Sequence, residues 1–395
     1  MSRVADFKQN APMRVELPEP SPDERAHSER LAAVICAEIA AAGGALDFAR
    51  YMELALYAPG LGYYSAGAQK FGAAGDFVTA PELGFLFARC MAHALAKDLR
   101  DLDGDVLELG PGSGALAAEL LLEFERLGTL PARYLLLERS ADLRARQRQT
   151  LQQRCAHLLP RCTWLDAPPA TAWQGVLIAN EVIDALPVRL FELRDDGLFA
   201  RVVTCAAQES FDWSDQLADE SLRLAVEAVL GTPLPALPLP YRSEICTQLR
   251  PWFAAVTHTL ERGVALFVDY GYTRQEYYAA TRRAGTLRCH YRHRAHDDPL
   301  LLPGLQDITA WVDFDALAAA ALEHGWRSET FTTQAQFLIA SGLDDIFADA
   351  YAAAPDEGTR YGLAQEAKHL MWPAEMGETF RAMRLRRGVR TEPSG

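Results

Sequence analysis

The chain has 395 residues, and its 53 Asp and Glu outnumber its 39 Lys and Arg, which gives a formal net charge of −14. Charged residues make up 23% and hydrophobic residues 49%, an ordinary balance for a globular protein with a real core. The acidic balance argues against a protein that grips nucleic acid through a broad basic face. No apolar run of about 18 residues is present, so we expect no membrane span.

The N-terminal residues 1–25 contain four prolines and several acidic side chains but no apolar core. We therefore expect a flexible extension rather than a secretory signal or a transit peptide. The seven cysteines are scattered, and none forms a C-x-x-C pair. Their odd number in a chain of this size favours reduced, mostly buried thiols, and we expect a cytoplasmic protein.

Three helices are predicted at the front of the chain, over 28–42, from Asp47 to near Pro59, and over 81–99. A glycine-rich and aromatic stretch separates the last two and must be a long loop. It could close over a ligand, although its glycines could also simply make turns and its threonine could cap the third helix. The loop residues that we expect at a ligand are Gly75, Asp76 and Thr79.

From Asp105 onwards, short apolar runs alternate with helical stretches, which is typical of a parallel sheet covered on both faces. We therefore predict a doubly wound, mostly parallel α/β fold. The predicted strands are 105–110, 133–138, 162–167, 175–180 and 263–271, with helices over 115–126 and 141–154.

An insertion separates the fourth and fifth predicted strands and begins with a hairpin around Asp196-Gly197. A proline-rich linker (232–241) and a helix (247–262) follow, and a helix (315–325) and two strands (327–333, 380–387) close the chain. The predicted parts are an extension (1–25), a helical cap (26–100), a core (101–187 and 251–395), an insert (188–250), and a loop (272–308) that adds to the substrate side.

That loop contains six arginines and three histidines. His290, His293 and His296 are spaced as on one face of a helix and invite a metal site. The flanking arginines would repel a cation, however, and no paired ligand cluster completes the set. We expect no metal there.

A glycine turn follows the first predicted strand and opens a helix, in the order Glu108, Gly110, Gly112 and Gly114. Its glycines let the backbone turn sharply and approach a ligand. A dinucleotide site would have a wider G-x-G-x-x-G spacing, and Glu108 would repel a pyrophosphate. The acid instead suits a ligand with a cationic part.

Two further acids end the next strands, where α/β sheets bind ligands. Glu138 can accept both hydrogen bonds of a ribose diol, and Asp166 could meet an adenine amino group. A single acid at a strand end is often only a solvated turn residue, and that alternative stays open for Asp166.

These motifs, together with GDFVTAPELGFLFARCMA (75–92), ANEVIDALPVRLFE (179–192), LFVDYGY (266–272) and GLQDITAWVDF (304–314), resemble the MidA family of class I methyltransferases. The resemblance implies a methyltransferase sheet and S-adenosylmethionine as methyl donor. The family includes a mitochondrial relative that dimethylates an arginine of a respiratory complex I subunit. The resemblance therefore also implies a protein-arginine substrate, with a complex I subunit as the candidate.

Carboxylates can hold a guanidinium by two parallel hydrogen bonds and leave another nitrogen free to attack a methyl group. Glu181 and Asp184 follow the fourth strand beside the expected methyl position, with Asn180 next to the cofactor. We expect Glu181, Asp184, Asp269 and Glu244 to be catalytic. The structural alternatives are a helix cap for Asp184, a strand-end cap for Asp269, and an acid favoured by a helix dipole for Glu244.

Enzymes that methylate base or amide nitrogens commonly carry Asn/Asp-Pro-Pro-Tyr/Phe at this place, whereas this chain has Asn-Glu-Val-Ile. That difference counts against a nucleic-acid substrate. Two other functions stay open, a non-catalytic assembly factor on a methyltransferase fold and a small-molecule methyltransferase.

Overall fold

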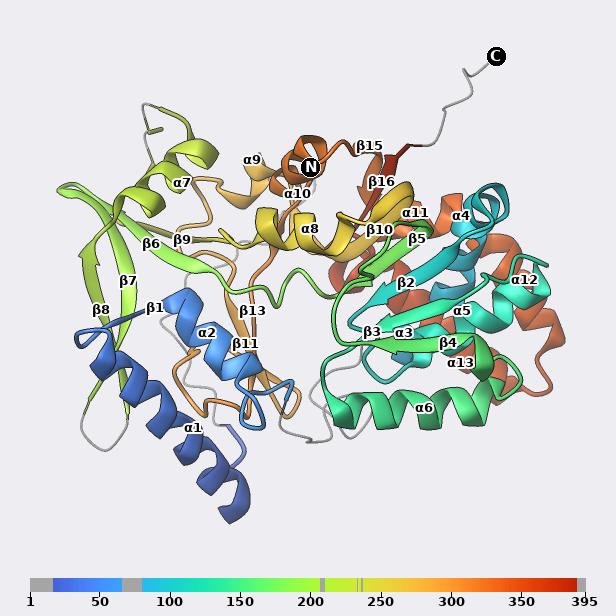
Figure 1. Ribbon diagram of the computed structural model, residues 1–395, viewed down its shortest axis with the longest axis horizontal. Coiled ribbons are helices and arrows are strands. Elements are labelled where there is room, and N and C mark those ends of the chain that lie inside the picture. The colour runs from blue at the N-terminus through green and yellow to red at the C-terminus, as the bar shows by residue number, and fades with distance from the viewer. Residues whose placement is uncertain (1–16, 66–79, 207–209, 233, 236, 389–395) are drawn as a thin grey trace.

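The computed structural model describes residues 17–65, 80–206, 210–232, 234–235 and 237–388. The molecule has two lobes, with a sheet layered between helices in one and an antiparallel sheet beside the first two helices in the other (Figure 1). Among the described residues, no helix combines the length and the apolar character that crossing a bilayer requires.

The larger lobe is built on a sheet with the strand order β15-β16-β10-β5-β2-β3-β4, and β14 pairs with β10 at one end. The strands from β4 to β10 run parallel, whereas β16 is antiparallel to both of its neighbours. The predicted doubly wound α/β fold is confirmed. The strands are β2 (Asp105–Leu109), β3 (Tyr134–Leu137), β4 (Cys162–Leu165), β5 (Trp173–Asn180), β10 (Leu260–Tyr272), β14 (Val312–Asp313), β15 (Arg327–Thr333) and β16 (Phe380–Arg387).

Helices cover both faces of this sheet because successive strand side chains point to opposite sides. Val106 and Ile178 pack into one apolar cluster, whereas Leu107 and Leu177 pack into the other. The first cluster includes residues of α4 (Leu86–Leu102), α5 (Ala115–Arg126), α6 (Ala141–Cys155), α11 (Gln334–Ala340), α12 (Leu343–Ala353) and α13 (Glu357–Met371). The second includes residues of α8 (Leu249–Thr257) and α10 (Phe314–Glu323).

The strand order reverses at β2. The chain goes outward from β2 through β3 to β4, and then returns to place β5 on the other side of β2. Connections leave in opposite directions at such a switch point and open a crevice at the carboxyl ends of the strands, where α/β sheets bind ligands.

The smaller lobe carries the antiparallel sheet β1-β7-β6-β9, with β8 paired to β7. The predicted hairpin is confirmed, since β6 and β7 pair around Asp196-Gly197. Neither β8 nor α7 was predicted from the sequence. Strand β8 has few apolar residues, whereas α7 is amphipathic, with Leu222 and Val226 buried. The elements are α1 (Pro22–Ala41), β1 (Leu46–Asp47), α2 (Phe48–Tyr57), β6 (Arg189–Arg194), β7 (Gly197–Cys205), β8 (Phe211–Leu217), α7 (Glu220–Leu230) and β9 (Tyr241–Ile245).

The segment 272–308, expected as a loop, contains a short helix and a small antiparallel sheet with the order β12-β11-β13. In β11, the buried Cys289 and Tyr291 alternate with residues that are more exposed. This alternation was not recognised in the sequence because arginines dominate the segment. The elements are α9 (Arg274–Tyr277), β11 (Arg288–Tyr291), β12 (Arg294–His296) and β13 (Asp307–Thr309).

The third predicted helix, over 81–99, is in fact two helices, α3 (Ala80–Leu83) and α4. The break lies at Gly84, where an added Cβ would be only 2.1 Å from Oε2 of Glu366 on α13. The Glu366 carboxylate also accepts a hydrogen bond from the Leu86 backbone N–H at 2.6 Å, at the start of α4. A tertiary contact that is distant in sequence therefore divides the helix.

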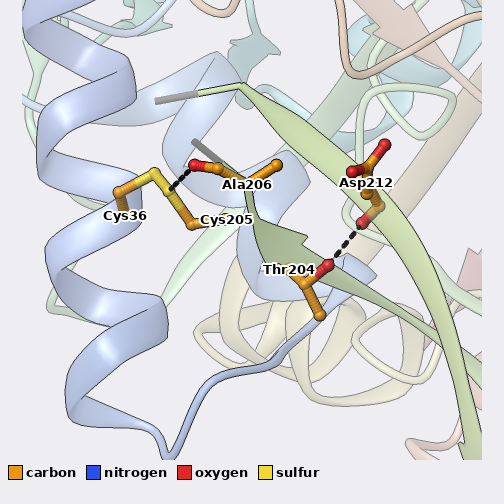
Figure 2. Close-up of a disulfide and its surroundings, with 5 residues drawn as sticks. All are labelled: Cys36, Thr204, Cys205, Ala206 and Asp212. Atoms are coloured by element: carbon orange, nitrogen blue, oxygen red, sulfur yellow. Dashed lines mark hydrogen bonds between the residues drawn. A yellow bond between two sulfur atoms is a disulfide. The ribbon is translucent and has the colours of Figure 1, made fainter. Parts of the chain in front are cut away.

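The expectation that all cysteines are reduced is wrong, because Cys36 of α1 and Cys205 of β7 form a disulfide (Figure 2). The two residues are 169 positions apart in sequence, and their Cα atoms are 5.5 Å apart. Spacing in the sequence cannot reveal such a pair. The antiparallel pairing of β7 with β8 is supported beside it by the Thr204 hydroxyl, which donates to the Asp212 carbonyl oxygen at 3.2 Å. The other five cysteines are free thiols.

Candidate active site

A cavity of about 1280 Å³ opens at the carboxyl ends of β2, β3 and β5, where the switch point predicts a ligand. Its walls come from both lobes. The sheet contributes Glu108, Glu138 and Asn180, whereas α2 contributes Tyr57 and α8 contributes Trp252. A cavity of this size can enclose a cofactor together with the group that reacts with it.

The glycine turn directly follows β2 and lines the cavity. Gly110, Gly112 and Gly114 have φ angles of +57°, +53° and +83°, in the left-handed region that favours glycine. A Cβ on Gly110 would lie 3.2 Å from Cγ2 of Val182. The turn therefore needs glycine both for its backbone conformation and for its close approach to the β5 segment.

Glu108 lies at the end of β2 with only 2% of its surface exposed. The Tyr134 hydroxyl donates a hydrogen bond to its Oε2 at 2.8 Å. Burial raises the pKa of Glu108 to about 7, although this hydrogen bond acts in the opposite direction. Glu108 forms no ion pair with the residues that the structure describes, so its carboxylate favours a cationic ligand.

Glu138 lies at the end of β3 and lines the same cavity. Its Oε1 accepts from the Ser140 backbone N–H at 2.8 Å, and its Oε2 accepts from Nε2 of Gln147 at 3.2 Å. Burial raises the pKa of Glu138, and these hydrogen bonds oppose the shift. Nε2 of Gln147 also donates to the Gly112 carbonyl oxygen at 3.0 Å, so one side chain ties the glycine turn to the acid.

Asp166, predicted to meet an adenine amino group, is placed differently. Its side chain is 83% exposed, forms an ion pair with Arg144 and lies outside the cavity wall. This geometry fits the solvated strand end that stayed open as the alternative. An adenine contact for Asp166 stays a prediction that would require Arg144 to move.

Asn180 and Glu181 enter the cavity wall from the end of β5. Glu181 has a φ of +52°, an unusual conformation for a residue with a side chain and one that concentrates at functional sites. Nδ2 of Asn180 donates to Oε1 of Glu181 at 3.2 Å. Burial, and next the charge of Asp184, raise the pKa of Glu181 to about 8. Glu181 can therefore hold or release a proton near neutral pH.

Asp184 lies behind the cavity wall rather than in it, and is 6% exposed. It belongs to a turn and caps no helix among the described residues. The Tyr270 hydroxyl donates to its Oδ2, and burial raises the pKa of Asp184 to about 6. Its charge acts on the cavity through Glu181.

Asp269 at the end of β10 is 1% exposed and also lies behind the cavity wall. Its Oδ2 accepts hydrogen bonds from the backbone N–H groups that follow Glu181, and burial raises its pKa well above the usual range. Asp269 therefore supports the turn that carries Glu181 and does not reach the cavity itself. The donors to Oδ2 are Val182, Ile183 and Asp184, at 3.2, 2.9 and 3.3 Å.

Glu244 lies in strand β9, and not at the start of a helix, where the helix-dipole alternative would place it. Its Oε1 accepts from the Tyr277 hydroxyl at 2.8 Å and from both the backbone N–H and the hydroxyl of Thr286. Burial raises its pKa. Glu244 lines a second, smaller cavity, so the structure does not bring it to the acceptor side of the large one.

Gly75, Asp76 and Thr79 lie outside the described residues. The side chains that sequence reasoning missed come mainly from the front segment. Glu82 lines the cavity and accepts a hydrogen bond from the Ser113 hydroxyl of the glycine turn. Tyr57 and Tyr64 stack with ring centroids 5.5 Å apart at the opposite wall. Glu82 lies three residues after Thr79, a capping-box spacing that predicts a helix start rather than a ligand contact.

The comparisons with known proteins agree with this geometry. Residues 86–332 match the model of a family described as "Putative S-adenosyl-L-methionine-dependent methyltransferase". The chain is 27% identical to the mitochondrial protein arginine methyltransferase NDUFAF7 of Rattus norvegicus over 368 residues, which cover 85% of this chain and 80% of the relative. The Drosophila melanogaster homolog is 28% identical over 344 residues, which cover 78% and 74%.

The structure is also similar to that of a Burkholderia thailandensis protein bound to S-adenosyl-homocysteine. The two share 42% identity and a TM-score of 0.89, and the match covers 95% of this chain and 96% of that one. The cavity at the switch point, with its glycine turn and strand-end acids, lies where such a ligand binds in an α/β sheet. The chain therefore belongs to this family of S-adenosyl-L-methionine-dependent methyltransferases.

Proposed function

We propose that the chain transfers a methyl group from S-adenosyl-L-methionine to an arginine side chain of a protein. The observation that carries the proposal is a group of three buried carboxylates at one wall of the large cavity. Glu181 is part of that wall, and Asp184 and Asp269 lie behind it. Among the described residues, none of the three forms an ion pair with Lys or Arg, and each has a raised pKa because of burial. A bound guanidinium would supply the missing positive charge.

The residues of the large cavity fit the methyl donor. Gly110 and Gly112 leave backbone exposed at the cavity floor, Glu138 can accept from a ribose diol, and Glu108 faces a cationic group favourably. When bound, S-adenosyl-L-methionine supplies an electrophilic methyl group on a sulfonium. The buried Oδ1 of Asn180, which meets no hydrogen-bond partner among the described residues, is a further acceptor available to the ligand.

The chain's own part in the reaction is to hold the acceptor and to take its proton. Glu181 can accept hydrogen bonds from a guanidinium, concentrate positive charge on those nitrogens and leave a third nitrogen free to attack. That nitrogen would bond to the methyl group as the methyl–sulfur bond of the donor breaks and S-adenosyl-homocysteine leaves, and it would then lose one proton. With a pKa of about 8 before the cation binds, Glu181 is suited to accept this proton.

The stacked rings of Tyr57 and Tyr64 form an aromatic part of the cavity wall that the acceptor can contact. The Tyr57 hydroxyl donates to the Ala185 carbonyl oxygen at 2.9 Å, and the Tyr64 hydroxyl donates to Oδ1 of Asp307 at 2.9 Å. Both rings are thus held in place through their hydroxyl groups. A guanidinium can stack on such a face.

The narrower proposal is that the acceptor belongs to a respiratory complex I subunit. It is supported by the motif resemblance to MidA proteins and by the 27% identity to mitochondrial arginine methyltransferases. A cytoplasmic location also remains a proposal, and cell fractionation tests it.

The test is transfer of radiolabelled methyl groups from S-adenosyl-L-methionine into extract proteins, followed by identification of the labelled residue by mass spectrometry. We expect label in arginine, and at least a hundredfold loss of rate with Glu181→Gln, because that change removes both the charge and the proton acceptor. The matched control is Glu261→Gln, at an exposed position of β10. Label in a small molecule, or equal rates for Glu181→Gln and the parent chain, would contradict the proposal.

A further inference from the structure

A second cavity of about 280 Å³ lies between the antiparallel sheet of the smaller lobe and the segment 282–299. It has no lining residue in common with the large cavity. The two are neighbours along β6, because Arg189 lines the large cavity whereas Leu190 and Phe191 line the small one. Its size is near the lower end of the range for small-molecule sites.

The charge of this cavity is opposite to that of the chain. Among the described residues, its lining contains four guanidinium groups and only two carboxylates, Glu244 and Asp297. The whole chain, in contrast, has a formal net charge of −14. The four arginines are Arg201, Arg242, Arg282 and Arg288.

The carboxylates near these arginines are already shared. Glu192 binds Arg242 and Arg194, and Asp215 binds Arg201 and Arg194. The Nε–Oδ1 distance from Arg201 to Asp215 is a long 3.3 Å. Burial and the repulsion from Arg242 lower the pKa of Arg201, which means that its surroundings disfavour the cation despite Asp215. The site is short of negative charge.

Arg282 forms no ion pair within the described part of the chain. Its Nε donates to the Glu276 carbonyl oxygen at 3.3 Å, and its guanidinium carbon lies 4.1 Å from the centre of the Tyr272 ring. Aromatic stacking of this kind orients a guanidinium and leaves its edge free to bind an oxyanion. Arg201 is held in a similar way, 4.7 Å from the centre of the Trp213 ring.

The wall that carries Arg282 is fixed against the sheet. The Arg242 backbone N–H donates to the Arg283 carbonyl oxygen at 3.1 Å, and Thr286 donates twice to Glu244. Gly285 between them has a φ of +75°, and a Cβ there would be only 2.0 Å from Oε2 of Glu244. The cavity is therefore shaped by specific contacts and keeps its form without a ligand.

Aromatic rings complete the lining. Trp213 and Trp311 add flat apolar surface to the same cavity.

We propose that the small cavity binds a small organic anion, a carboxylate or a phosphate ester. Its charged oxygens would bind the guanidinium groups of Arg201 and Arg282, and its apolar body would pack against the tryptophan rings. Bidentate binding of oxyanions is the interaction for which arginine geometry is best suited.

The test uses the full chain with its cofactor cavity filled by S-adenosyl-homocysteine, so that added probes report on the small cavity. The probes are benzoate and phenyl phosphate, with benzyl alcohol as the neutral control. Titration calorimetry and tryptophan fluorescence should show binding of at least one anion with a Kd of about 1 mM or tighter, weakened by salt. Trp213→Phe should reduce the fluorescence change, because it removes one of the two indole rings that line the cavity.

Arg282→Gln should weaken anion binding about tenfold or more, because it removes one oriented guanidinium. The matched control is Arg148→Gln, which removes a guanidinium 4.3 Å from the centre of the Trp164 ring at a remote position. Retained binding of S-adenosyl-homocysteine would show that both variants are folded. The proposal is overturned if neither anion binds at about 10 mM, if benzyl alcohol binds as well as the anions, or if both variants weaken binding equally.

Discussion

Replacing Asp269 tests how the strained turn at Glu181 is held. The Asp269 carboxylate accepts four backbone hydrogen bonds, from Val182, Ile183 and Asp184 to Oδ2 and from Tyr270 to Oδ1 at 2.9 Å. The alanine variant leaves all four donors without this partner in a site that is 1% exposed. Each buried unpaired donor costs about 1–3 kcal/mol, and water entering the vacated space recovers part of this, so we expect a loss of about 3–5 kcal/mol of stability.

Asp269→Asn should cost less. The single carbonyl oxygen of asparagine can accept hydrogen bonds from the donors on one side, while its amide NH2 group faces the donors on the other side. We therefore expect a loss of about 1–3 kcal/mol of stability. The unusual φ of +52° at Glu181 is held by these contacts, and its relaxation would move the carboxylate. A displacement of about 1 Å at an acceptor site can cost a hundredfold in rate, which is the loss of kcat that we expect for Asp269→Ala.

The measurements are urea unfolding and methyl transfer, each with a matched control. Asp313 also has a buried carboxyl group at the sheet edge, where its Oδ1 accepts from the Ala316 N–H at 3.0 Å and caps α10. Asp313→Ala should lose about 1 kcal/mol of stability and keep its rate. An Asp269→Ala chain with the stability and kcat of the parent would refute the positioning role. An equal fall of rate in both variants would show that the rate follows stability alone.

Three further predictions concern the cofactor site and the disulfide. The pKa of Glu108 is raised to about 7 and its ionised form attracts a cation, so the affinity for S-adenosyl-L-methionine should increase as the pH rises through 7. Calorimetry should show that Tyr134→Phe shifts this increase to higher pH, because the Tyr134 hydrogen bond lowers the pKa of Glu108. Gly110→Val should weaken cofactor binding at least about tenfold because of its positive φ and the nearby Val182, whereas Gly128→Ala, with a φ of +65° and open space around it, should lose only about 1 kcal/mol of stability. Titration of the denatured, unreduced chain should find five thiols; seven would show that the Cys36–Cys205 bond is absent, and reduction should lower stability by about 2–4 kcal/mol.

The sequence predicted the central sheet and the cofactor end of the site because both depend on local patterns. The strand ending at Leu109 contains a run of apolar residues and is buried throughout, its glycine turn has a recognisable spacing, and Glu138 ends the next strand. Hydrophobic period and turn chemistry can be read from neighbouring residues. The parallel order then fixes which strand ends meet.

The roles of the acids near the acceptor could not be read in the same way. The structure places Asp184 and Asp269 behind the wall of the large cavity and Glu244 in the wall of the small one, and each has its own set of donors. Whether a carboxylate faces a cavity or a backbone N–H depends on contacts between segments 40 to 90 residues apart, as for Glu244 with Thr286 and Val182 with Asp269. No local pattern records such a choice.

The sequence by itself therefore determined the fold class, the glycine turn and the two strand-end acids that line the large cavity, Glu108 and Glu138. The tertiary structure alone decided the pairing of Cys36 with Cys205, the break in the third helix at Gly84, and the arginine-lined cavity beside Glu244. The physical reason is the range of the interactions. Periodicity and turn conformation are properties of adjacent residues, whereas disulfides, close backbone approaches and cavities arise only when distant segments pack together.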